Sequence, residues 1–138
     1  MSFEVFVQCF RNGSRAGIPR DQVRSAFGKF LTEAEPLYWT VRYDDENYCQ
    51  VAVDIHDGDK NLVHHLCIES PCGDKRLWDA LVTILKLGTV VLYFPGDAPP
   101  LVAENSVVAH LPPDMVEALG TPICIQTGDE IVRHIEAA

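Results

Sequence analysis

The sequence predicts an α+β fold: a mostly antiparallel sheet of about five to six strands, with two main helices packed on one face and short C-terminal helices. Several segments alternate apolar and polar residues, which is typical of strands, and two longer segments repeat apolar residues at helical spacing. Three of the alternating segments follow one another directly, which indicates antiparallel pairing. The length of 138 residues, 47% of them hydrophobic, is that of a single domain covering residues 1–138.

The chain begins with a strand and a helix. Phe3, Val5 and Val7 lie at every second position, as in a strand with one buried face, and Asn12-Gly13 then provides a turn signal. From Pro19 the apolar period becomes that of a helix, and its expected buried stripe comprises Val23, Phe27, Phe30 and Leu31.

Three further strands are expected in the middle of the chain. Alternation over residues 37–44 and again over residues 51–55, with Asp45-Glu46-Asn47 between them, predicts a hairpin. After a turn at Asp57-Gly58-Asp59, residues 62–69 form the third strand. Together these strands make an antiparallel meander.

The second main helix begins after Asp74, which is its expected N-cap. Apolar residues recur at helical spacing from Leu77 to Leu85, and Gly88 lies where a left-handed C-cap is expected. Residues 89–94 are then almost continuously apolar, β-branched or aromatic. This composition predicts a strand buried on both faces near the centre of the sheet.

The C-terminal part is predicted to hold two short helices and a strand. Pro112-Pro113 begins the first helix, and Gly120 ends it. Residues 123–125 form a strand, and Asp129 then caps the terminal helix.

The charge and the cysteine content limit the classes of partner and the cellular compartment that we expect. Eleven Lys and Arg against 20 Asp and Glu give a net charge of −9 at pH 7, which opposes binding to nucleic acid and to anionic membranes. The five cysteines contain no C-x-x-C pair, which fits a reducing cytoplasm better than a secreted disulfide framework. No signal peptide is recognisable, and no stretch approaches the roughly 20 apolar residues of a membrane span. We therefore expect a cytoplasmic protein.

Several segments resemble a group of small, mostly uncharacterised bacterial proteins: residues 3–13, 72–81, 93–96 and 110–115. The likeness extends over nearly the whole chain. Proteins of this kind are small, acidic α+β domains, similar in style to the immunity proteins with which bacteria neutralise their own or a neighbour's toxin. The resemblance implies a binding protein and brings no catalytic motif.

Acidic side chains gather at the ends of the predicted hairpin strands. They can converge into one negative surface that attracts a basic partner, with an exposed tyrosine as an aromatic anchor. The alternative is that they are solvated turn residues. The candidate partner-binding residues are Asp44, Asp45, Glu46, Tyr48, Asp54, Asp57 and Asp59.

A small cysteine-dependent enzyme is the alternative function. Cys72 directly precedes a predicted helix, whose dipole favours the nucleophilic thiolate. Catalysis would also need a histidine within hydrogen-bond reach, and His64, His65 and His110 are available. A buried, inert cysteine is the competing interpretation. The phosphate-binding glycine motifs and the nucleophile elbow are absent from the sequence.

Metal sites are disfavoured by the spacing of the ligands. Asp54, Asp57 and Asp59 lack the longer series of oxygen ligands that a calcium loop needs. His64 and His65 are adjacent on a strand and are expected to point to opposite faces, so they would not share a zinc ion. The sequence predicts no metal and no other cofactor.

The function predicted from these observations is non-enzymatic binding. The protein would be an immunity-type inhibitor that binds a basic toxin domain through its acidic surface and neutralises it. A self-associating domain is the third hypothesis. The edges of such a sheet must be covered or charged, and an edge strand can be covered by pairing with another copy of the chain. A homodimer is compatible with either binding role.

Overall fold

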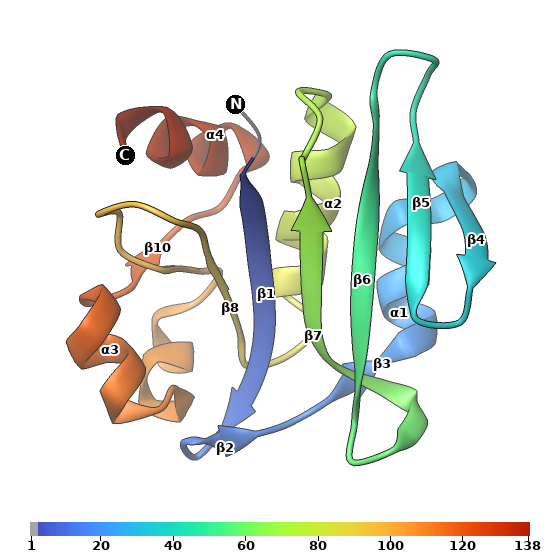
Figure 1. The fold of residues 1–138 in the computed structure, drawn as a ribbon. Coiled ribbons are helices and arrows are strands. Elements are labelled where there is room, and N and C mark those ends of the chain that lie inside the picture. The colour runs from blue at the N-terminus through green and yellow to red at the C-terminus, as the bar shows by residue number, and fades with distance from the viewer. Residues whose placement is uncertain (1–2) are drawn as a thin grey trace.

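The computed structural model describes residues 3–138 and has an α+β fold (Figure 1). Its strands are β1 (Glu4–Arg11), β2 (Ser14–Arg15), β3 (Ile18–Pro19), β4 (Leu31–Glu35), β5 (Tyr38–Arg42), β6 (Tyr48–His56), β7 (Asp59–Glu69), β8 (Val90–Tyr93), β9 (Leu101–Val102) and β10 (Ile123–Cys124). Its α-helices are α1 (Arg20–Phe27), α2 (Lys75–Leu85), α3 (Pro113–Leu119) and α4 (Gly128–Ala137), and its 3-10 helices are η1 (Gly28–Phe30) and η2 (Asn105–His110).

The strands form one ten-stranded sheet in the order β10-β9-β8-β1-β7-β6-β5-β4, with β2 paired to β1 and β3 paired to β7. The expected meander is present as β5, β6 and β7, and β8 lies inside the sheet between β1 and β9. The sheet is mixed, because β9 and β10 are parallel whereas the other pairs are antiparallel.

The sheet is larger than the five to six strands expected from the sequence. The strands β2, β3 and β9 are two residues long, which is too short to show an alternation. The sequence did not predict β4, because Leu31 continues the apolar stripe of the first helix. Gly28, with a φ of 64°, ends that helix at Phe27, and Leu31 begins β4 instead.

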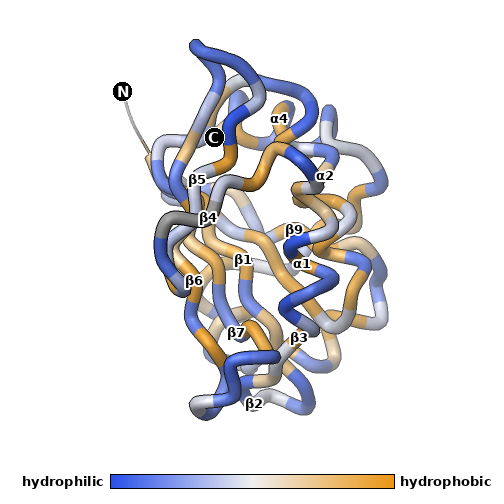
Figure 2. The backbone as a smooth tube through the Cα atoms, turned by 90° about the vertical axis from the view of Figure 1, so that its right-hand side faces the viewer, coloured by the Kyte–Doolittle hydropathy of each residue, from blue (hydrophilic) through white to orange (hydrophobic). Residues whose placement is uncertain are grey.

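The two main helices, α1 and α2, pack on one face of the sheet as predicted, whereas η2 and α3 lie on the opposite face. The main core lies between the sheet and the helices α1 and α2, and α4 packs beside α2 (Figure 2). The opposite face is covered by η2 and α3 over β8 and β9, where Phe10, Val91 and Val102 form a second core with residues of these helices. In residues 3–138 no helix lies in front of β5, β6 and β7 on this face (Figures 1 and 2).

Local signals for the helix ends were partly correct. Asp74 is the N-cap of α2, and its carboxylate accepts a hydrogen bond of 2.9 Å from the backbone N–H of Arg76. The C-cap of α2 is Lys86 and not Gly88. The N-cap of α4 is Thr127 and not Asp129, because Thr127 and Glu130 form a reciprocal capping box.

Within residues 3–138 none of the helices combines the length and the apolar character that a membrane span requires.

The helices α2 and α4 approach each other closely at Gly128. A Cβ atom added there would lie 2.9 Å from the backbone carbonyl carbon of Trp78 and 2.9 Å from the backbone nitrogen of Asp79. Both contacts are with backbone, which cannot rotate away. Gly128 therefore allows the N-terminus of α4 to lie directly against α2.

We expect Gly128→Ala to lower the free energy of unfolding by about 1–3 kcal/mol, because the added methyl group overpacks this contact. Urea denaturation measures the change. Gly73→Ala is the matched control, since a Cβ at Gly73 would meet no atom within 4 Å. An equal effect of the two substitutions would contradict the close packing of α2 and α4.

Candidate functional site

The face of the sheet that lies opposite α1 and α2 carries a set of half-buried and exposed side chains. Along β1, β6 and β7 these residues alternate with fully buried ones such as Val5, Val51 and Ile68. Cross-strand pairing places them side by side in rows. We call this surface the open sheet face; it comprises Glu4, Phe6, Gln8, Tyr38, Thr40, Gln50, Ala52, Asp54, His65, Cys67, Glu69 and Tyr93.

Two glutamates are paired across neighbouring strands on this surface. Glu4 of β1 is paired with Glu69 of β7 in the sheet register, and like charges in this arrangement repel. Glu69 Oε1 accepts a hydrogen bond of 2.6 Å from the Tyr38 hydroxyl, and Glu4 Oε2 accepts one of 2.9 Å from the Cys67 thiol. Among the described residues no Lys or Arg forms an ion pair with either carboxylate. Within the described residues the pair therefore lacks a basic counterpart.

The negative field of the open sheet face acts on Cys67. Burial, the hydrogen bond to Glu4 and the charges of Glu4, Glu69 and Asp54 raise the pKa of the Cys67 thiol to about 12. Cys67 is therefore protonated at neutral pH and is a poor nucleophile. Its role on this surface is that of a weak hydrogen-bond donor.

Aromatic rings form the centre of the surface. Phe6 stacks on Tyr93 with 5.2 Å between ring centroids, and on the other side it stacks on His65 at 5.8 Å. The Tyr93 hydroxyl donates a hydrogen bond of 2.5 Å to Gln8 Oε1. These contacts join β1, β7 and β8 and fix the orientation of the rings.

A β-bulge in β7 changes the expected directions of the two adjacent histidines. His65 pairs with both Gln8 and Asp54, and Val63 pairs with Ile55, so His64 is the extra residue. His64 does not point to the face opposite His65, as strict alternation predicts. Its Nε2 lies 3.4 Å from Gln8 Nε2, on the same face as His65.

The hydrogen bonds of His64 indicate its tautomer. Its Nδ1 lies 3.1 Å from the Ala16 carbonyl oxygen, which can only accept, so Nδ1 carries the hydrogen. Its Nε2 then accepts from the side-chain amide of Gln8. Both ring nitrogens of His64 are thus engaged in the protein.

The histidines do not form a metal site. The ring centroids of His56 and His64 are 6.3 Å apart, and those of His64 and His65 are 6.4 Å apart. The part of the chain that the structure describes contains no group of three His, Cys, Asp or Glu side chains that could hold a metal ion.

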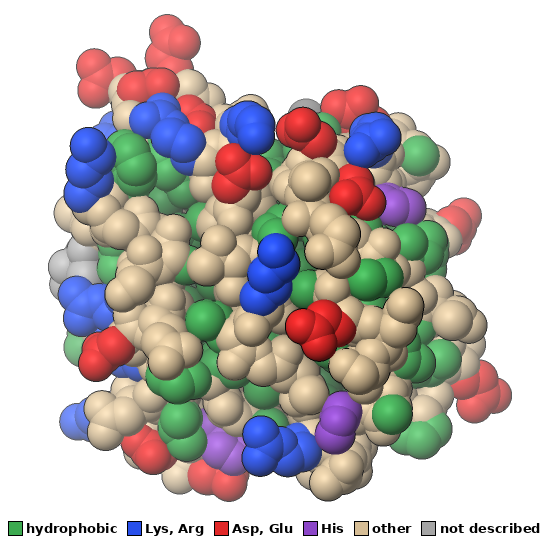
Figure 3. All heavy atoms as spheres, turned by 180° about the vertical axis from the view of Figure 1, so that it is seen from behind, with side chains coloured by type: hydrophobic (Ala, Val, Ile, Leu, Met, Phe, Trp, Pro, Cys, Tyr) green, Lys and Arg blue, Asp and Glu red, His purple; other side chains and the backbone are tan. Residues whose placement is uncertain are grey.

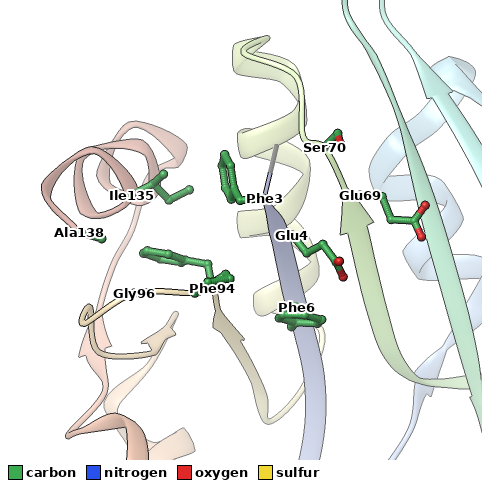
Figure 4. A pocket seen from close by; sticks show the side chains of 10 residues that line it. Phe3, Glu4, Phe6, Glu69, Ser70, Phe94, Gly96, Ile135 and Ala138 are labelled. Carbon is green, nitrogen blue, oxygen red and sulfur yellow. The ribbon is translucent and has the colours of Figure 1, made fainter. Parts of the chain in front are cut away.

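A cavity of about 700 Å³ lies at the edge of the open sheet face, where β1 begins and α4 ends (Figure 4). Figure 4 shows the rings of Phe3 and Phe94 beside Ile135 of α4, whereas the Glu4 carboxylate points toward β7 and the Glu69 carboxylate points from β7 toward β6. The lining is thus mainly aromatic and aliphatic on one side and acidic on the other.

The acidic groups predicted from the sequence do not converge into one surface. Asp44, Asp45 and Glu46 are in the turn between β5 and β6, whereas Asp57 is in the turn between β6 and β7 and Asp59 is the first residue of β7 (Figure 1). These turns lie at opposite ends of β6, whose nine residues span about 30 Å. Antiparallel pairing therefore separates the two groups.

Several of these acidic side chains have local structural roles. Asp44 Oδ1 accepts hydrogen bonds from the backbone N–H groups of Glu46 and Asn47, at 2.9 and 2.8 Å, which stabilise the turn. Asp59 Oδ1 accepts one from the N–H of Asn61 at 2.8 Å. Asp57 takes a positive φ of 49° before Gly58, as expected in a tight hairpin turn.

The remaining predicted residues lie on the same side of the sheet as the new site. Asp54 belongs to the open sheet face and lies 3.5 Å from His65 Nδ1. Tyr48 is 46% exposed, and the Arg42 guanidinium lies 4.3 Å from the centre of its ring.

The structure does not support a pairing of Cys72 with a histidine. Cys72 packs against the main core and lies within hydrogen-bonding reach of Cys49. His64 and His65 are on the opposite side of the sheet, and His110 Nδ1 accepts a hydrogen bond of 3.2 Å from the Asn12 N–H. The three histidines are therefore engaged elsewhere.

No known protein family, curated protein or solved structure matches this chain. The likeness to immunity proteins remains a prediction.

Basic side chains gather on the helical side of the molecule. Figure 3, which views that side, shows Lys and Arg interspersed with Asp and Glu. Most of the 11 basic residues lie in or next to helices: Arg20, Arg24, Lys29, Lys75, Arg76, Lys86 and Arg133. This distribution leaves the open sheet face the more negative side, although Arg42 lies at its margin on β5.

Sequence reasoning did not identify Glu4, Phe6, Glu69 and Tyr93 as neighbours. The alternation showed that Glu4 and Phe6 face away from the core. It could not show that β1 lies between β7 and β8, because that pairing joins residues far apart in the sequence. No pattern of residues that are adjacent in the sequence indicates that β1 lies between these two strands.

We expect Glu4→Gln to lower the pKa of Cys67 from about 12, because the substitution removes a charge that opposes the thiolate. Alkylation of each cysteine by iodoacetamide, followed by peptide mass spectrometry over a range of pH, measures the shift. Glu46→Gln removes the same charge from the distant β5–β6 turn and should leave the profile unchanged. An unchanged profile in Glu4→Gln would contradict the electrostatic coupling.

Acid should destabilise the protein through His65. Burial is the largest cause that lowers its pKa in the fold, and Asp54 partly opposes this effect. The unfolded chain binds the proton near pH 6.5, at about the ordinary histidine pKa, while folded His65 stays neutral. Its stabilising contribution is therefore complete above about pH 6.5 and is lost as the pH falls through the folded pKa.

Urea titrations between about pH 7.5 and pH 5 test this expectation. The free energy of unfolding should fall more steeply with acid in the wild type than in His65→Gln, which cannot titrate. Parallel pH profiles of the two proteins would show that burial of His65 does not contribute to the pH dependence of the free energy of unfolding.

Proposed function

We propose that the protein is a non-enzymatic binding protein that uses the open sheet face to bind a basic protein partner. The observation that carries this proposal is the Glu4–Glu69 pair, two opposed carboxylates without a basic counterpart among the described residues. Such a pair destabilises the isolated sheet. A cation supplied by a partner would relieve the repulsion.

The chemistry of the surrounding surface supports the same role. Tyr38 is exposed, and Phe6 and Tyr93 are half-buried, so aromatic area is available beside the carboxylates. Aromatic residues, tyrosine above all, contribute strongly to binding at protein interfaces. The network of hydrogen bonds and stacked rings holds these side chains in place before binding, which reduces the entropy lost on association.

The finer proposal is an immunity-type inhibitor that neutralises a bacterial toxin by covering its basic surface. Its support is the net charge of −9, with most basic side chains kept on the helical side. A negative surface accelerates association with a basic partner by about 10–1,000-fold at low salt, an advantage for a protein that must intercept a toxin.

Capture from a lysate of the source cells tests the proposed surface. Thr40→Arg places a bulky cation on the open sheet face, in the cross-strand row of Gln50 and Glu69, and we expect it to reduce capture of a basic protein by about tenfold or more. Thr83→Arg is the matched control, because it makes the same change on the exposed side of α2. Capture by the wild type should also weaken as the salt concentration rises.

The same experiment separates this surface from the acidic turn. Loss of capture in Asp45→Asn/Glu46→Gln, with normal capture in Thr40→Arg, would place the interface at the β5–β6 turn and contradict the proposal. The inhibitor role is tested on the captured protein: its toxicity to cells should be suppressed by co-expression of the wild type and not of Thr40→Arg.

A further inference from the structure

The cavity beside Glu4 and Glu69 has two chemically distinct sides. Phe3, Phe94 and Ile135 provide an aromatic and aliphatic side, and Glu4 and Glu69 line the cavity on the side of β7, toward which the Glu4 carboxylate points (Figure 4). Its volume of about 700 Å³ is within the range of ligand sites in proteins. A group that fills it must therefore carry both apolar surface and positive charge.

Both carboxylates keep acceptor capacity for such a group. The Tyr38 hydroxyl occupies one site on Glu69, and the Cys67 thiol, a weak donor, occupies one on Glu4. A carboxylate has about four lone-pair sites, so each can accept further hydrogen bonds from an ammonium or guanidinium group. The aromatic rings add a favourable electrostatic surface for a cation.

We propose that the cavity receives a lysine or arginine side chain of the partner, with its aliphatic stem against Phe3 and Phe94 and its charged head at Glu4 and Glu69. This inference rests on the proposed function and names the chemical group that anchors the partner. Long basic side chains match the lining because they bury an apolar stem while the charged end stays hydrated or paired. Anionic and purely apolar groups would leave the two carboxylates uncompensated.

Binding of capped amino acids to the full chain tests this site. N-acetyl-lysine methylamide and N-acetyl-arginine methylamide are titrated by NMR, and N-acetyl-norleucine methylamide is the uncharged counterpart of the lysine probe. We expect the basic probes to bind with dissociation constants of the order of millimolar, about fivefold or more tightly than norleucine. The resonances of Phe3, Phe6 and Phe94 should shift.

Three variants locate the interaction. Glu4→Gln/Glu69→Gln keeps side-chain acceptors for Tyr38 and Cys67 but removes both charges, so it should abolish the preference for basic probes. Asp45→Asn/Glu46→Gln removes two charges from the distant turn and should keep the preference. Phe3→Leu, which retains the apolar character at the beginning of β1, should weaken all three probes.

Equal affinity for lysine and norleucine probes, or an unchanged preference in Glu4→Gln/Glu69→Gln, would overturn the inference. Tighter binding of n-butylammonium, a free amine, than of the lysine probe would also overturn it, because it would indicate a small metabolite as the ligand. These results are independent of the proposed function. If capture depends on Thr40 but the cavity binds no cation, only the present inference fails; if the cation binds but no partner is captured, only the proposed function fails.

Discussion

The position of β1 between β7 and β8 is the constraint on which the rest of the structure depends. Both neighbours are antiparallel to β1, so its alternating residues must serve two different environments. Val5, Val7 and Cys9 complete the core under the helices, whereas Glu4, Phe6 and Gln8 lie on the open sheet face. One strand thereby sets the stability of the domain and the composition of its proposed binding surface.

The same constraint explains why opposed carboxylates persist on this surface. The sheet register is fixed by burial of the apolar faces of β1 and β7, because a shift by one residue would expose Val5 and Ile68. The packing free energy of these residues is larger than the repulsion between Glu4 and Glu69. The core therefore holds Glu4 and Glu69 opposite each other in the register, without an ion pair between either of them and a basic residue of the described chain.

Local patterns in the sequence predicted the β5–β7 meander and the beginning of α2, because alternation and N-capping are properties of neighbouring residues. They did not predict β4, whose first residue, Leu31, continued a helical stripe until Gly28 broke the helix. They also missed the bulge at His64 and the neighbours of Glu4. A bulge depends on cross-strand pairing, and pairing between distant segments depends on the whole core.

The pairing of β1 also has a consequence for the order in which the domain assembles. Its partners are far along the chain, since Glu4 pairs with Glu69 and Phe6 pairs with Tyr93. On the ribosome, the β5–β7 hairpins can close early, while the first strand must wait until residues 90–93 have emerged before it can be inserted between its neighbours. Until then the edge of β1 that pairs with β8 is open, and this unpaired edge can associate with another chain.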